Sequence, residues 1–165
     1  MNAEAHVHHH NQHHAASTRS TLNRTALSAT IHCLTGCAIG EVLGFVIGTA
    51  LGWGTAQTII LAVALAFLFG YGLTMLPLLR SGLPFRTSLG LALAADTASI
   101  TIMEIVDNLI MLVIPGAMDA GLMSLLFWGS LAVALLIAGA FAFPLNRWLI
   151  ARGRGHAVVH SFHGH

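Results

Sequence analysis

The sequence contains a run of potential metal ligands at helical spacing. Cys33, Cys37 and Glu41 follow one another at intervals of four residues, and His32 precedes them. On a helix the three four-spaced side chains occupy one sector about 80° wide. Thiolate, imidazole and carboxylate groups bind transition metals, and thiols favour a soft or borderline ion such as copper(I) or zinc. The alternative interpretation is that both cysteines are small apolar side chains of a core.

A second run supplies three carboxyl groups. Asp96, Glu104 and Asp107 share one helical face, because the second and third lie about 80° and 20° around a helix from the first. Asn108 lies just beyond this face. Carboxylates alone suit a proton relay or a harder cation. Alternatively, the acids are protonated and form hydrogen bonds only with neighbours on their helix.

The composition indicates the solvent in which these helices lie. Of the 165 residues, 56% are hydrophobic and 8% are charged, whereas about a quarter of the residues in soluble domains are charged. We therefore expect the chain to lie in a lipid bilayer. The seven basic residues are all Arg, and six acids nearly balance them. The sequence therefore lacks the basic surface that is typical of nucleic-acid-binding proteins.

Four apolar segments are long enough to cross a bilayer, which needs about 20 residues in helical form. They cover residues 27–51, 58–79, 87–114 and 121–145. Open strands cannot satisfy their backbone polar groups in lipid, so these segments are helices. The predicted fold is therefore all-α, a four-helix transmembrane bundle over residues 26–150. A disordered His-rich tail (residues 1–25) precedes it, and an Arg- and His-rich cytoplasmic tail (residues 151–165) follows it.

The arginine positions predict the orientation of the bundle. Arginines occur before the first span, between the second and third, and after the fourth: Arg19, Arg24, Arg80, Arg86, Arg147, Arg152 and Arg154. The other two connections contain neither Arg nor Lys. Four spans place all seven positive charges on one side, and the positive-inside rule makes that side cytoplasmic. Both termini are therefore predicted to be cytoplasmic.

The depth of the two ionisable runs predicts that they meet. Cys37 and Asp96 each lie roughly ten residues into a helix that starts on the cytoplasmic side, which corresponds to a depth of about 15 Å. Acids that faced lipid would be unfavourable, so we expect a polar column between the first and third helices. The candidate metal ligands are His32, Cys33, Cys37, Glu41 and Asp96. The candidate cation or proton path continues through Glu104, Asp107 and Asn108.

Histidines at both ends of the chain form a second group of potential ligands. Six of the eleven histidines lie in the first fourteen residues, and four lie in the last ten. Neutral imidazole binds divalent metals. The candidate peripheral ligands are His6, His8, His9, His10, His13, His14, His156 and His160. The alternative is that both tails are solvated and hold no dedicated metal.

Glycines recur every four residues along the first span. Gly36, Gly40, Gly44 and Gly48 lie on one line of a helix and would let another helix backbone approach closely. The sequence leaves open whether that helix belongs to the same chain or to a second copy. A homo-oligomer through these four glycines is therefore one predicted partnership, and the lipid bilayer is the other.

Four stretches of the chain resemble a known family. They are residues 32–37 with Gly40 and Glu41, residues 94–97, residues 103–108 and residues 146–153. Together they resemble a bacterial family of small integral membrane proteins, the domain-of-unknown-function family numbered 4396. The resemblance extends over residues 30–160. It implies a four-helix domain and no established activity, and a multi-pass protein of this kind is expected in the bacterial plasma (inner) membrane.

Together these patterns predict an integral membrane protein that binds or transports a metal cation or protons. No catalytic constellation is recognised, so the protein is not predicted to be an enzyme. An alternative is a membrane assembly or accessory protein whose buried acids only fix helix packing. A third interpretation, a thiol redox enzyme, requires cysteine chemistry without the C-x-x-C spacing that is typical of redox motifs.

Overall fold

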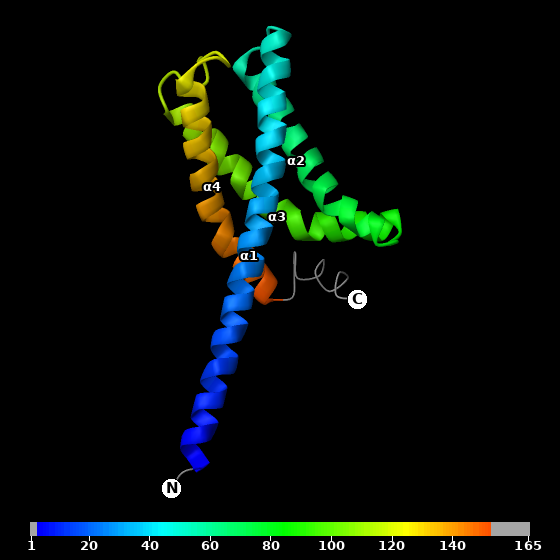
Figure 1. Cartoon of the computed structure of the whole chain (residues 1–165). Coiled ribbons are helices and arrows are strands. Elements are labelled where there is room, and N and C mark those ends of the chain that lie inside the picture. The colour runs from blue at the N-terminus through cyan, green and yellow to red at the C-terminus, as the bar shows by residue number, and fades with distance from the viewer. Residues whose placement is uncertain (1–2, 153–165) are drawn as a thin grey trace.

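The computed structural model describes residues 3–152, with side chains described from Arg19 onward. This part of the chain forms four helices, α1 (Ala3–Ala50), α2 (Thr55–Arg80), α3 (Phe85–Val113) and α4 (Leu125–Ala151), shown in Figure 1. All four helices are long and apolar enough to cross a membrane. The predicted all-α, four-helix transmembrane architecture is therefore confirmed, and the protein is a multi-pass membrane protein.

Helix α1 includes most of the segment that the sequence analysis describes as a His-rich tail, residues 1–25. The helix begins at Ala3 and runs without a break to Ala50. In Figure 1 its blue N-terminal half extends well beyond the other helices. Residues 3–35 contain neither glycine nor proline, the two residues that most strongly disfavour a helix interior. The segment that qualifies as a membrane span starts at Arg19.

The fourth helix also lies further along the chain than the predicted range of 121–145. It starts after Ser124, whose side chain accepts a hydrogen bond from the Leu126 backbone N–H at 3.1 Å. It continues through Pro144 to Ala151. Membrane helices tolerate an internal proline because neighbouring groups satisfy the carbonyl that proline leaves without a donor. The proline therefore does not end this helix.

The arrangement of the helices gives α1 a central position. It contacts each of the other three helices. The α1–α2 and α3–α4 connections lie at the same end of the bundle, whereas the α2–α3 hairpin slants away to one side (Figure 1). Because the four spans alternate in direction, α1 and α3 run the same way across the membrane. The beginning of α1, the α2–α3 connection and the end of α4 then share the side that carries the described arginines.

Helices α1 and α2 pack along their small residues. The glycines of α1 meet, in order along the helix, Gly70, Ala66, Ala62 and Thr58. A Cβ atom added to Gly36 would lie 2.7 Å from the Cα of Gly70, and the following glycines are still more crowded. A homo-oligomer was predicted through the face formed by Gly36, Gly40, Gly44 and Gly48, and in this structure that face is occupied without a second copy. Helix α2 of the same chain covers it, because only a glycine line lets the two backbones come so close.

Candidate functional site

The interface between α1 and α3 brings the two ionisable runs together. The Cys33 thiol donates to Oδ1 of Asp96 at 3.8 Å. One turn further along, the Cys37 thiol faces the carboxyl group of Glu104. The exposed fraction of these four side chains is 4% or less. The helical spacing of each run and the parallel direction of the two helices therefore place thiols opposite acids at matching depths.

Three carboxyl groups meet in the next part of the same interface. Glu41 of α1 lies against Asp107 of α3 and also interacts with Glu104. Their exposed fractions are 1%, 2% and 4%. Asn108 donates to the backbone oxygen of Glu104 at 2.9 Å, and its Nδ2 lies 3.5 Å from the Glu104 Oε2. Neither carboxyl oxygen of Glu41 has a hydrogen bond of regular geometry within the described residues. This acid cluster, Glu41, Glu104 and Asp107, therefore retains capacity to bind protons or cations.

The acid cluster faces no positive side chain among the described residues. The groups that interact with its members are the other acids of the cluster, Cys37 and Asn108. The described arginines are all exposed, and none of them is among those groups. Charged carboxylates are unfavourable in hydrocarbon unless they are paired, so such groups hold a proton or bind a cation.

A second polar network joins three helices on the arginine-bearing side of Cys33. Asn146 of α4 donates to Thr30 Oγ1 of α1 at 3.0 Å and to Ser99 Oγ of α3 at 3.1 Å. All three side chains are buried. Hydrogen bonds between helices stabilise a particular arrangement in the membrane, where few competing partners exist. This network positions α1 and α3 against each other beside the Cys33–Asp96 contact.

His32 does not join the thiols. Its Nε2 lies 3.0 Å from the Thr74 hydroxyl of α2, and the ring is half-buried. On a helix, consecutive residues point about 100° apart, so His32 faces α2 while Cys33 faces α3. Thr74 also interacts with Asp96, and it thereby connects the histidine to the α1–α3 interface.

The predicted metal ligands are not assembled into one centre. Over the described residues, no group of three or more His, Cys, Asp and Glu side chains is placed to hold a metal ion. The proposed set of His32, Cys33, Cys37, Glu41 and Asp96 is instead divided between several contacts along α1. The N-terminal candidates His6, His8, His9, His10, His13 and His14 lie on α1, but their side chains are outside the described ones, and His156 and His160 lie outside the described residues altogether.

The side chains of Thr74 and Asn146 were not among the predicted site residues, although the sequence contains a signal for both. Thr74 is the last member of the line of small residues with which α2 meets α1. Asn146 lies four residues beyond Ala142 and continues the buried line of α4. A polar residue at the end of a small-residue line faces another helix rather than lipid. That periodicity alone would have identified both.

Burial also determines what the cysteines can do. Both are free thiols, and their exposed fractions are 0% for Cys33 and 1% for Cys37. Thiol exchange needs an accessible thiolate beside groups that stabilise its charge. The neighbours of these thiols are acids instead, so the geometry does not favour redox chemistry.

Comparison with known proteins identifies the family. A family model described as a domain of unknown function, DUF4396, matches residues 22–155. The match includes the acid cluster, both cysteines and the Asn146 network. No curated protein and no solved structure matches the chain. Since the match covers most of the sequence, the chain belongs to the DUF4396 family.

Proposed function

We propose that this membrane protein binds and moves protons through the α1–α3 interface. The observation that carries the proposal is the acid cluster: three buried carboxyl groups, no described cation beside them, and oxygens of Glu41 without a regular hydrogen bond. Carboxyl groups inside a membrane commonly form proton relays. Protons fit this cluster better than a metal ion, since no three His, Cys, Asp or Glu side chains of the described residues are placed to hold a metal ion together.

The order of groups along the interface suggests a route for the relay. Asp96 lies toward the arginine-bearing side, and Glu104, Glu41 and Asp107 lie progressively toward the other side of the membrane. The Cys37 thiol, which faces Glu104, is a further, weak hydrogen-bond donor on this route. We further propose that the protein resides in a bacterial plasma membrane with both termini in the cytoplasm. The distribution of arginine and the family resemblance support this placement.

Proton flux in proteoliposomes tests the proposal. The purified full chain would be reconstituted with a pH-sensitive dye inside, and a potassium diffusion potential would be imposed with valinomycin. We expect the wild type to acidify the interior faster than empty liposomes, and Glu41→Gln and Asp107→Asn to return the rate to background. Asp119→Asn is the matched control, because Asp119 is an exposed acid in the α3–α4 connection. Wild-type flux equal to that of empty liposomes, or unchanged flux in both amide variants, would contradict the proposal.

A second candidate function is membrane assembly, in which the buried polar groups only fix helix pairing. The observation that favours it is Asn146, which joins α4 to both α1 and α3 through two hydrogen bonds. This alternative predicts no proton flux in the wild type. It also predicts that amide substitutions of the acids change the stability of the bundle and nothing else.

Metal binding by the cysteines is a separate prediction that elemental analysis can test. We would compare the full chain with a variant that carries Cys33→Ser and Cys37→Ser, both in a background whose N-terminal histidines are replaced by Gln. Copper or zinc that is retained by the first protein and lost by the second would support a core site. Equal metal content in the two proteins would remove the cysteines from consideration.

A further inference from the structure

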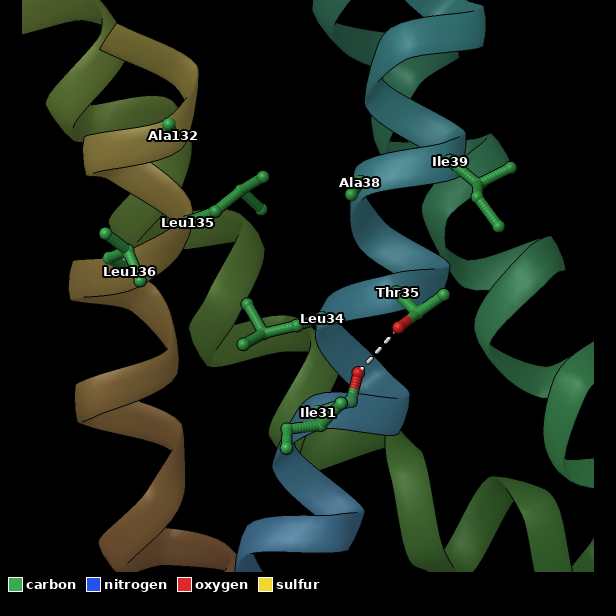
Figure 2. A pocket seen from close by; sticks show the side chains of 8 residues that line it. All are labelled: Ile31, Leu34, Thr35, Ala38, Ile39, Ala132, Leu135 and Leu136. Atoms are coloured by element: carbon green, nitrogen blue, oxygen red, sulfur yellow. Dashed lines mark hydrogen bonds between the residues drawn. The ribbon is translucent and has the colours of Figure 1, made fainter. Parts of the chain in front are cut away.

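A groove that the proposed proton path does not use runs along the outer surface between α1 and α4. It has two adjoining parts, with cavity volumes of about 520 and 390 Å³. Figure 2 shows the first part, where Leu34 of α1 and Leu135 of α4 extend into the space between the helices. Ile31, Leu34 and Leu136 line both parts, so the two form one continuous groove.

The groove offers almost no free hydrogen-bonding group to an occupant. Its only polar side chains are Thr30 and Thr35. The hydroxyl group of each donates to a backbone oxygen of its own helix, at 2.9 Å for Thr30 and 2.8 Å for Thr35. The remaining lining is aliphatic, glycine or aromatic. An occupant must therefore be apolar along the length of the groove.

The length of the groove matches one half of a bilayer. On α1 the lining extends from Leu27 to Ile39, which is about 18 Å at 1.5 Å per residue. The hydrocarbon core of a bilayer is about 30 Å thick, so one leaflet contributes about 15 Å. A single extended acyl chain of one leaflet would therefore fill the groove from end to end.

Two arginines lie at one end of the groove. Arg24 precedes Leu27 by three residues, and Arg147 follows Phe143 by four, so helical periodicity puts each on the face that lines the groove. The Arg147 Nε donates to Oδ1 of Asn23 at 2.7 Å and so joins α4 to α1 here. Both arginines are exposed, and residues 19–31 and 139–152 contain no acid. This end therefore carries positive charge at the level where lipid headgroups lie.

We propose that the α1–α4 groove binds an anionic phospholipid, with one acyl chain between the helices and the phosphate at Arg24 and Arg147. Arginine binds phosphate through several N–H groups, and basic side chains beside a membrane attract anionic headgroups. A second copy of the chain is a poorer occupant. Two copies with the same orientation would place four of these arginines at one depth around a shared groove, where like charges repel.

Native mass spectrometry of the full chain in detergent micelles tests this proposal. The protein would be titrated with dioleoyl phosphatidylglycerol or with zwitterionic dioleoyl phosphatidylcholine. We expect the first lipid to bind more tightly, and Arg24→Gln and Arg147→Gln each to weaken its binding about five-fold. Arg86→Gln is the matched control, because Arg86 is an exposed arginine in the first turn of α3 and lies away from the groove.

A second pair of variants tests the apolar part of the site. Replacing Ala132 and Ala140 by Phe fills both parts of the groove, and we expect it to remove phosphatidylglycerol binding. Ala64→Phe adds the same side chain at an exposed position of α2 and should leave binding unchanged. Thermal unfolding of every variant identifies any that fail to fold, and the arginine variants then carry the test.

Three results would overturn the proposal. The first is equal binding of the two lipids by the wild type. The second is binding by the arginine and groove-filled variants that stays within two-fold of their controls. The third is a wild-type dimer that the groove-filled variant converts to a monomer without any change in lipid binding, since a second copy would then be the occupant.

Discussion

The two faces of α1 make different kinds of contact, and the adjacent residues Gly40 and Glu41 show the difference. Gly40 faces α2, where an added Cβ atom would collide with the backbone of Ala66. Glu41 faces α3, where its carboxyl group lies against Asp107 and lacks a regular hydrogen bond within the described residues. One face is packed backbone against backbone, whereas the other holds polar side chains that are incompletely satisfied.

This comparison indicates a division between stability and function. Close contact between small residues maximises dispersion between helices, which lipid cannot replace. Buried acids without countercharges lower stability, and proteins keep such groups chiefly at functional sites. We therefore expect substitutions on the α2 face to affect folding and substitutions in the acid cluster to affect proton movement.

The largest effect is expected from Gly40→Leu. The new side chain has no space, because the neighbouring atoms are the backbone of α2 and cannot move without separating the helices. We expect a loss of at least about 3 kcal/mol of unfolding free energy in detergent, or no folded protein. Gly72→Leu is the control, since no atom lies within 4 Å of a Cβ added at Gly72. Equal stability of the two variants would mean that α1 and α2 are not in the close contact described.

A moderate effect is expected from Asn146→Leu. The substitution removes two hydrogen bonds and leaves the hydroxyls of Thr30 and Ser99 without this donor. Interhelical hydrogen bonds in membranes contribute about 0.6 kcal/mol each on average, so we expect a loss of about 1–2 kcal/mol. Phe141→Leu, at an exposed position of α4, serves as the control. Unchanged thermal stability of the Asn146 variant would remove this network from the forces that align α1, α3 and α4.

A small stability effect with a large functional effect is expected from Glu41→Met. The carboxyl oxygens of Glu41 lack regular hydrogen bonds in the described part of the chain, so an apolar side chain of similar length removes an unfavourable burial. We expect an unfolding free energy that is unchanged or higher by about 1 kcal/mol, together with loss of proton flux. Destabilisation by more than about 2 kcal/mol, with flux retained, would instead assign Glu41 to helix packing.

The smallest effect is expected in thiol labelling of the folded protein. Cys33 and Cys37 are buried in the folded bundle, so a membrane-impermeant maleimide should label neither of them until the protein is unfolded. A variant with Cys33→Ser, Cys37→Ser and Ser81→Cys is the positive control, because residue 81 is exposed next to the end of α2. Rapid labelling of the folded wild type would reopen the redox interpretation.

Much of the architecture follows from the sequence alone. The apolar segments are long enough to cross a bilayer, and in lipid they must be helical because no water satisfies the backbone. The arginine distribution predicts which side of the membrane is cytoplasmic. Glycine every four residues predicts a close helix contact. Even the meeting of the acids of α3 with the thiols of α1 follows from their shared face and depth, since charged or polar groups avoid lipid.

Other features depended on the tertiary structure. Periodicity shows that Gly40 lies on a packing face but cannot show which helix covers it, because any small-residue line is a suitable partner; the structure pairs it with α2 of the same chain. Adjacency in the sequence groups His32 with the thiols, whereas the turn of the helix and the position of α2 bring the imidazole to Thr74. Which side chains share a site is decided by three-dimensional neighbours, and these come from helices far apart in the sequence. The sequence determines that polar groups must face inward, and only the packing of the four helices determines which partners they find there.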